Sequence, residues 1–276
     1  MLSPKSENMG PDWRITSVDI DKTLDFVKKM ESKTYVRKRI RDNISLPPPE
    51  ITHDLIWEGM FDCLLSTRQK SGPDSPIAKF LTQIPFPLHY EICIKQENPE
   101  RFISEQLGAQ KGIQYYNKIA RFAVSNLEWL ENGGWDKIDS WILPLKKQRE
   151  KSPETWHQKT ERDASRNLSD FLWGIGPKQS RNYLQLLGLT RYEIPLDSRF
   201  VNWFSENEFP LLFDSVPISM VDRKLINQRL SVPYWYDGIL DRLQELCLKC
   251  NILPVVLDAC VFASFDPDWK AEKIPF

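Results

Sequence analysis

Apolar positions recur three and four residues apart along most of this chain, which is the period of a helix with one buried face. Runs that alternate between apolar and polar residues, the pattern of a half-buried strand, are few. Twenty prolines and eleven glycines break the helical pattern into many short segments. The sequence therefore predicts an all-α protein. The expected helices cover residues 21–43, 52–69, 77–81, 99–107, 114–130, 162–172, 178–187, 198–204, 237–250 and 254–265.

Clear breaks separate these segments. Three consecutive prolines at 47–49 end the first helix, and residues 70–76 form a loop rich in Gly, Pro and Ser. Residues 146–159 are polar, which indicates a loop or linker. The first twenty residues carry two prolines and one glycine and are expected to form a loose arm.

Composition sets the size of the core and limits the surface chemistry. A length of 276 residues fits one or two domains, and 41% hydrophobic residues supply a substantial core. Lysine and arginine number 37 against 38 acidic residues, so the net charge is −1. The simplest sign of nucleic-acid binding, a strongly basic chain, is therefore missing. A DNA-binding surface has to come from a local excess of cations or from backbone amides.

The sequence also indicates a compartment. Five cysteines, an odd number, do not make the disulfide framework of a small secreted protein. The first ten residues are polar and lack the apolar core of a signal peptide, and no stretch approaches eighteen uninterrupted apolar residues. We expect a soluble cytoplasmic protein that does not span a membrane.

Residues 162–204 carry the strongest chemical signal. Two helical patterns are joined by a short turn at 172–178, with the sequence L-W-G-I-G-P-K. Gly174 and Gly176 let the chain turn tightly and bring backbone N–H groups close to a ligand, and Pro177 suits the first position of the second helix. The start of that helix offers unpaired N–H groups and a positive dipole end, which bind phosphate. The alternative is an ordinary helical turn.

Polar side chains continue from the turn along one face of the second helix. This stripe comprises Lys178, Arg181, Asn182 and Gln185. An ordinary solvated helix face has the same pattern. Further along, Asp197 follows a short apolar run and precedes a helical pattern, as the N-cap of a helix does. Its carboxylate is then able to face the same cleft as Lys178, and capping alone is the plainer alternative.

In these motifs the chain resembles the helix-hairpin-helix DNA glycosylase superfamily, which contains endonuclease III and 8-oxoguanine DNA glycosylase. That family carries a G-h-G-x-K turn, matched here by G-I-G-P-K at 174–178, and a catalytic aspartate in an h-x-h-D motif, matched by I-P-L-D at 194–197. Upstream, L-L-S-T-R-Q at 64–69 resembles the segment whose polar tip fills the gap left by an extruded base. Residues 111–120 resemble the segment that precedes the hairpin helices. The resemblance extends over about residues 52–265 and is closest over 162–204.

The resemblance implies two α-helical subdomains with the DNA cleft and the base pocket between them. Residues 1–20 would be an N-terminal arm, and residues 21–71 would be N-terminal helices that pack with the C-terminal part. Residues 72–200 would form the central subdomain, with the helix-hairpin-helix at 162–188. Residues 201–276 would complete the first subdomain with C-terminal helices.

The resemblance also implies a bifunctional DNA glycosylase and AP lyase that acts in DNA repair on a damaged base of the 8-oxoguanine type. A base in duplex DNA must be extruded into a pocket before it can be excised. The Asp197 carboxylate would stabilise the positive charge that builds on the sugar. Lys178, partly desolvated at a helix N-terminus, would attack C1′ and form a Schiff base, which leads to strand cleavage by β-elimination.

Further residues take supporting roles in this interpretation. The residues expected to contact the DNA backbone are Gly174, Gly176, Lys178, Arg181 and Arg199, the last in place of a histidine that the family often has. Arg68 and Gln69 would fill the gap in the duplex. The candidates for the base pocket are Asn182, Trp173, Asp258 and Phe262. For such aromatic residues a place in the core is the commoner alternative.

Cysteine spacing argues against the iron–sulfur cluster of endonuclease III-like members. Those members carry C-x6-C-x2-C-x5-C, whereas Cys247 and Cys250 are followed only by Cys260. Cys247 and Cys250 fall on an apolar helix stripe, and all three cysteines are expected in the core. The sequence predicts no metal cofactor, and it leaves open a monovalent cation at the hairpin.

The expected partner is double-stranded DNA carrying a modified base, bound by a monomer associated with the nucleoid. Two alternatives stay open. The same chemistry would serve an antiviral defence enzyme that excises hypermodified bases of phage DNA. A non-catalytic helix-hairpin-helix module would only grip the DNA backbone, which requires the glycines but neither Lys178 nor Asp197.

Overall fold

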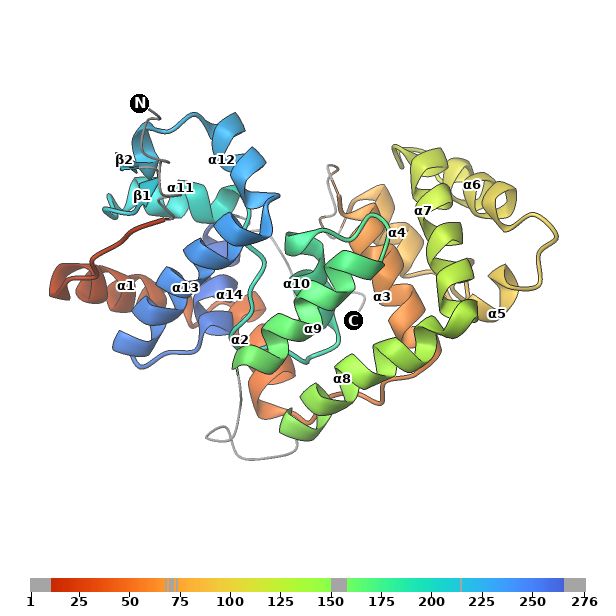
Figure 1. The fold of residues 1–276 in the computed structure, drawn as a ribbon, viewed down its shortest axis with the longest axis horizontal. Helices are drawn as coiled ribbons and strands as arrows, with labels where there is room; N and C mark the ends of the chain where they lie inside the picture. Colours follow the sequence, from red (N-terminus) through yellow and green to blue (C-terminus); the bar gives the residue numbers. More distant parts are fainter. Residues whose placement is uncertain are drawn as a thin grey trace, which may run out of the picture.

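The computed structural model describes residues 11–67, 69, 72, 74–149, 158–213 and 215–265. These residues fold almost entirely into helices, which confirms the predicted all-α class (Figure 1). Within this part of the chain the only strands are β1 (Leu212–Phe213) and β2 (Val216–Pro217), which pair antiparallel. The helices enclose two hydrophobic cores.

The first core is contiguous in sequence and occupies the centre and right of Figure 1. Its buried side chains run from Ile56 to Leu189. A helical turn, η2 (Leu130–Gly134), joins two of its helices. The helices of this core are α3 (His53–Leu65), α4 (Pro76–Leu81), α5 (Tyr90–Cys93), α6 (Pro99–Ala109), α7 (Tyr116–Trp129), α8 (Trp135–Arg149), α9 (Gln158–Phe171) and α10 (Pro177–Leu186).

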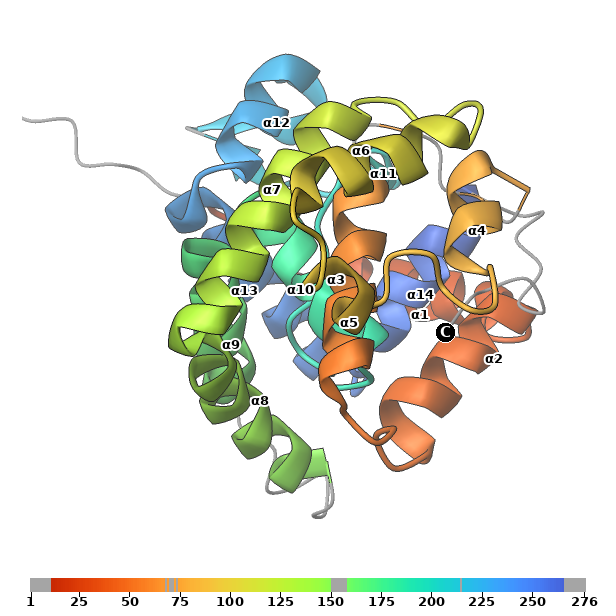
Figure 2. The same cartoon turned by 90° about the vertical axis from the view of Figure 1, so that its right-hand side faces the viewer.

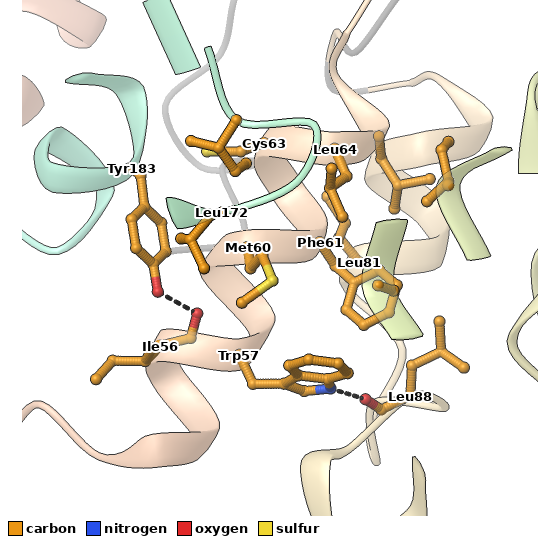
Figure 3. Close-up of a cluster of buried hydrophobic side chains, with 14 of the residues drawn as sticks. Ile56, Trp57, Met60, Phe61, Cys63, Leu64, Leu81, Leu88, Leu172 and Tyr183 are labelled. Carbon is orange, nitrogen blue, oxygen red and sulfur yellow. Dashed lines mark hydrogen bonds between the residues drawn. The ribbon is translucent and has the colours of Figure 1, made fainter. Parts of the chain in front are cut away.

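Helix α3 runs through the middle of the first core, and most of its side chains are buried. The Trp57 indole donates a hydrogen bond to the Leu88 carbonyl at 2.7 Å, and the Tyr183 hydroxyl of α10 donates to the Ile56 carbonyl at 2.6 Å (Figure 3). Gly59 lets α3 and α10 approach closely, because a Cβ atom there would lie 3.0 Å from the Tyr183 ring. These contacts fix the position of α10, whose first turn carries the candidate chemistry.

The second core joins the two ends of the chain and lies on the left of Figure 1. Two N-terminal helices pack there with the helices that follow residue 197. The turn η1 (Arg41–Ser45) extends the second helix, and η4 (Ile218–Met220) lies between β2 and α12. The helices of this core are α1 (Ser17–Met30), α2 (Thr34–Ile40), α11 (Ser198–Glu206), α12 (Arg223–Leu230), α13 (Pro233–Lys249) and α14 (Pro254–Phe265).

The division of the chain differs from the sequence interpretation at its N-terminal end. Residues 21–71 were expected to pack together with the C-terminal helices, but α3 lies in the first core, because its apolar residues cover more than one face. The expected loose arm is packed where it is described. Trp13 is 2% exposed, and the backbone of Asp12 bridges to Leu212.

The linker expected at 146–159 is helical up to Arg149, and residues 150–157 lie outside the described part. Arg149 holds the end of α8 in place by donating to the carbonyls of Asp42 at 2.9 Å and Ile44 at 3.1 Å. These carbonyls lie at the C-terminal end of α2 and η1, where backbone acceptors lack helical partners. The polar sequence thus belongs to a helix whose end is tied to another element.

Among the described helices, none is both long and apolar enough to cross a membrane by itself. Helices α13 and α14 meet that requirement only as a pair bent by 104°. Both helices contribute side chains to the second core.

Candidate functional site

Helices α9 and α10 pack against each other and are joined by a short turn, so the predicted helix-hairpin-helix is present (Figure 1). Gly174 has φ +80°, and a Cβ atom there would lie 2.6 Å from both Leu64 and Phe122. Only glycine fits that position. Gly176 is the N-cap of α10 in an extended conformation, and a Cβ atom there would meet nothing within 4 Å. The space beside Gly176 is open to a ligand, next to the first turn of α10.

The turn is held by side chains from two neighbouring helices. The buried Asn126 amide accepts from the Trp173 N–H at 2.7 Å and donates to the Trp173 carbonyl at 3.1 Å. At the start of α10, the Gln179 amide donates to the Cys63 carbonyl at 2.8 Å and to the Thr67 hydroxyl at 2.6 Å. The hairpin is therefore held in place by contacts to α7, α3 and Thr67.

The structure brings Lys178 and Asp197 together. The Lys178 Nζ atom lies 3.4 Å from Asp197 Oδ2, and the two side chains are 36% and 19% exposed. Lys178 stands in the first turn of α10. Asp197 is the N-cap of α11 and accepts from the Arg199 N–H at 2.8 Å, as its place in the sequence predicts. Two helix N-termini thus meet at an amine and a carboxylate.

Arg199 closes one side of this pair. Its guanidinium donates to Asp197 Oδ2 at 2.8 Å and lies 4.3 Å from the centre of the Phe262 ring. The Phe262 ring in turn stacks on Tyr35, with centroids 4.4 Å apart and planes at 19°. The Asp197 carboxylate therefore faces two cations, and an aromatic surface begins directly behind Arg199.

Asp258 belongs to the same wall as Phe262, because both lie on α14 one helical turn apart. The buried Asp258 carboxylate accepts from the Gln185 amide at 2.7 Å. Burial raises the pKa of Asp258 to about 6, although the nearby Arg39 lowers it, and the charge of Asp197 adds to the rise. Two of the four predicted pocket residues, Asp258 and Phe262, thus lie beside the Lys178–Asp197 pair.

Sequence reasoning missed several residues of this region. Tyr35 and Arg39 come from α2, and the Arg39 guanidinium donates to the Tyr35 hydroxyl at 2.6 Å. Asp62 on α3 is another acid near Arg39, and burial raises its pKa to about 6. Asp62 continues the four-residue spacing of Asp54 and Glu58 on α3, so the sequence does not distinguish it from a solvated acid. Nothing local in the sequence links α2 to α14.

The other two pocket candidates are Asn182 and Trp173. Asn182 is half-buried one turn beyond Lys178, and its amide donates to Gln179 Oε1 at 2.7 Å. Trp173 is 61% exposed. It lines a hollow of about 610 Å³ between the hairpin, the end of α3 and the start of α7, and neither Lys178 nor Asp197 lines this hollow.

Arg181 does not serve the DNA backbone in this structure, contrary to the sequence interpretation. It is 1% exposed, and its guanidinium donates to Glu193 and Asp237, each at 2.8 Å. A third bond at 3.0 Å reaches the Pro177 carbonyl. The polar face of α10 at Arg181 lies against α13 of the second core, so Arg181 links the two cores.

Of the two residues predicted to fill a duplex gap, Arg68 lies outside the described residues. The Gln69 side chain accepts from the Gln114 N–H at 2.9 Å and donates to the Gln114 carbonyl at 3.4 Å. Gln69 is thereby tied to the segment that precedes α7.

All five cysteines are buried as free thiols. Cys247, Cys250 and Cys260 lie in the second core, as their apolar helical positions predict. Within the described ranges, no group of three or more His, Cys, Asp or Glu side chains is placed to hold a metal ion.

These features define an all-α fold built around a helix-hairpin-helix. Three solved structures share it. The 8-oxoguanine DNA glycosylase of Methanocaldococcus jannaschii aligns with a TM-score of 0.56 at 18% identity, over 90% of this chain and 94% of that one. The 8-oxoguanine glycosylase/lyase of the same organism, in complex with 15mer DNA containing 8-oxoguanine, gives 0.57 at 15% identity, over 90% and 98%. The 8-oxoguanine DNA glycosylase of Thermotoga maritima gives 0.51 at 17% identity, over 89% and 96%.

The fold is therefore that of the 8-oxoguanine DNA glycosylases. The sequence matches no protein-family model, and none of the curated proteins matches it. At these identities the likeness shows the shared architecture, and the site chemistry must be argued from this chain's own residues.

Proposed function

We propose that this protein is a DNA N-glycosylase with AP-lyase activity, which excises an oxidised base of the 8-oxoguanine type from duplex DNA. The observation that carries the proposal is the distance of 3.4 Å between Lys178 Nζ and Asp197 Oδ2, at the meeting point of two helix N-termini. A module that only grips the DNA backbone needs neither side chain. The likeness of the fold to that of 8-oxoguanine DNA glycosylases supports the substrate class.

The DNA backbone is proposed to lie against the hairpin. The open side of Gly176 and the free N–H groups of the first turn of α10 form an anion site that needs few side-chain cations. Lys178 adds a charge at the same place, and Arg199 lies at the edge of the Asp197 carboxylate. Duplex DNA is thus held by backbone amides more than by net charge, which suits a chain whose net charge is −1.

The extruded base is proposed to enter between Phe262 and Asp258. Tyr35 covers one face of the Phe262 ring, so the base would stack on the other face in place of the Arg199 guanidinium. The ionised Asp258 would accept hydrogen bonds from N–H groups on the edge of the base. Tyr35 and Arg39 of α2 and Gln185 of α10 hold these two groups in position.

The reaction then follows from the amine and the carboxylate. Lys178 attacks C1′ as the C1′–N bond breaks, the electron pair leaves with the base, and the base takes up a proton. Asp197 stabilises the positive charge that develops on the sugar. The Lys178–C1′ adduct opens to a Schiff base, and loss of a proton from C2′ expels the 3′ phosphate by β-elimination. DNA and side chains supply every group, so the proposal includes no metal.

The test is a set of duplexes that each carry one modified base, incubated with the protein and sodium borohydride. Borohydride reduces a Schiff base to a stable amine, so a covalent protein–DNA adduct is expected with a duplex containing 8-oxoguanine. Lys178→Gln should abolish the adduct. Lys118→Gln, a lysine in the first turn of α7, is the control and should retain it.

Failure of every modified duplex to give an adduct would contradict the proposal. Trapping that survives Lys178→Gln would assign the nucleophile to another amine. An adduct confined to duplexes with hypermodified phage bases would keep the chemistry and replace the repair substrate by foreign DNA. We further propose that the protein acts as a monomer on DNA in the nucleoid.

A further inference from the structure

We infer that residues 215–234, named the α12 surface, form a second contact for duplex DNA in addition to the hairpin. The inference rests on the proposed function. It concerns the undamaged duplex that flanks the extruded base, and none of the residues assigned above to the reaction or to the base takes part.

The α12 surface is fixed to the helix that carries Asp197. Turn η4 packs against α11, and Ile218 is 2% exposed with its N–H bonded to the Leu211 carbonyl at 2.9 Å. Helix α12 packs against α13, and Ile226 is its only buried residue. A ligand on the α12 surface is therefore held at a set distance from the catalytic carboxylate.

The outward side of this segment has a local excess of positive charge. Residues 215–234 contain one acid, Asp222, and three bases, in a chain with net charge −1. Asp222 uses its carboxylate to cap α12, accepting from the Lys224 N–H at 2.7 Å and the Leu225 N–H at 3.3 Å. Arg223 and Lys224 stand exposed in the first turn. This is the local asymmetry that a near-neutral DNA-binding protein requires.

Exposed apolar side chains lie next to these cations. Met220 is 77% exposed and Leu225 is 40% exposed. Cations that neutralise phosphates, combined with apolar side chains that enter the minor groove, form a pattern found on proteins that bind the minor groove of DNA. Apolar exposure alone would suit a protein partner, and the adjacent Arg223 and Lys224 favour DNA.

The position of the α12 surface in the molecule is compatible with bound duplex DNA. In Figure 1, α12 lies in the upper part of the molecule, to the left of the turn that joins α9 to α10. Figure 2, turned by 90°, keeps α12 at the upper end. A duplex carries about one negative charge per 1.7 Å of its axis. A duplex held at the hairpin and extending over the upper side therefore brings further phosphates to Arg223 and Lys224.

The experiment compares two double charge reversals in the full-length protein. Arg223→Glu with Lys224→Glu alters the α12 surface, and Lys28→Glu with Lys29→Glu is the control. The control pair is exposed in the last turn of α1 and makes the same change in net charge. Affinity for undamaged duplexes of about 9 and about 25 base pairs is measured against salt concentration, and circular dichroism verifies the fold.

The α12 variant is expected to bind the long duplex about tenfold more weakly, with a log–log salt slope shallower by about 1 to 2. The control should stay within about twofold. Borohydride trapping on a short duplex containing 8-oxoguanine should be unchanged in both variants. An unchanged salt slope in the α12 variant would overturn the inference and leave the surface to a protein partner, and so would equal losses in both variants. If the wild-type protein gives no borohydride adduct with any lesion, the proposed function is wrong. The affinities for undamaged duplex still test the inference about the α12 surface in that case.

Discussion

Asp197 caps α11 through the Arg199 N–H, pairs with Lys178 and accepts from the Arg199 guanidinium. An asparagine caps a helix about as well as an aspartate. It carries no charge, however, and so cannot stabilise a cation on the sugar. Substitution by asparagine therefore separates the structural task of this residue from its proposed chemical task.

We predict that Asp197→Asn slows base release by about 10²-fold or more while the melting temperature stays near that of the wild type. Single-turnover excision with excess enzyme measures the first quantity, and thermal unfolding measures the second. Arg199→Gln tests whether the cation beside Asp197 contributes, and a smaller loss is expected. An unchanged rate in Asp197→Asn would reduce Asp197 to a helix cap.

The second residue-scale prediction concerns Asp258. Burial raises its pKa from 3.8 to about 6, so the folded protein holds a proton that the unfolded chain has released. The contribution of this group to stability is therefore present below pH 4 and is lost as the pH rises through 6. The variant Asp258→Asn has no carboxyl group to ionise and should not lose this stability. The free energy of unfolding of the variant minus that of the wild type should therefore increase between pH 4 and 7, by at most about 3 kcal/mol.

Urea unfolding at several pH values provides the measurement. Asp62, whose pKa burial also raises to about 6, contributes with the same sign in both proteins and cancels in the difference. Parallel pH profiles of wild type and Asp258→Asn would mean that Asp258 keeps an ordinary pKa in the folded protein.

At the scale of elements, the two hairpin glycines have different tasks. Gly174 is required by its positive φ and by Leu64 and Phe122, each of which a Cβ atom would approach to 2.6 Å. Gly176 has an ordinary extended conformation and open space beside it. The sequence treats the two residues as equivalent, whereas the structure assigns one to the fold of the turn and the other to the approach of a ligand.

We therefore predict that Gly176→Val leaves the melting temperature nearly unchanged and weakens binding to damaged and undamaged duplex alike, because phosphate contacts carry no sequence information. Gly174→Val should instead lower stability by about 1–3 kcal/mol, because backbone strain and steric overlap act together. Thermal unfolding and fluorescence anisotropy separate the two outcomes. If Gly176→Val altered only which base is excised, the hairpin would belong to the base pocket.

The success of sequence reasoning at this scale depends on how local each signal is. The hairpin, Lys178 and the Asp197 cap are encoded within a few residues each, and they were predicted. Helix α8 was missed because it contains Pro144 and ends in a run of charged residues, which hid its buried side. Arg181 resembled a solvated residue because its partners, Glu193 and Asp237, come from other elements.

At the scale of the molecule, a near-neutral chain should bind DNA with few ionic contacts. The hairpin amides, Lys178, Arg199 and the α12 surface are the proposed contacts, and Arg181 is buried. Since the log–log slope of affinity against salt is about −0.9 per neutralised phosphate, we predict a slope of about −2 to −5. Fluorescence anisotropy of an undamaged duplex at several salt concentrations measures it. A slope steeper than about −6 would require a cationic surface that none of these contacts supplies.

The proposed base pocket was the least predictable part, and the reason lies in the overall arrangement. Tyr35 and Arg39 come from α2, while Phe262 and Asp258 come from α14, at opposite ends of the described chain. The helical period predicted a helix around each of these residues, at 21–43 and 254–265, without singling out Tyr35 or Arg39. The helical period does not indicate which helix packs against which, because the contact between α2 and α14 depends on the packing of the whole second core.

This packing has a consequence for biosynthesis. The first core is built from one continuous stretch, Ile56 to Leu189, whereas the second core needs residues near both ends of the chain. During synthesis on the ribosome, all residues of the first core are made before α11, α13 and α14, with which α1 and α2 pack. Lys178, the proposed nucleophile, thus emerges well before the aromatic side chains of α14 that are proposed to receive a base. A nascent chain interrupted before α14 would contain Lys178 but would lack Asp258 and Phe262, which are proposed to recognise the base.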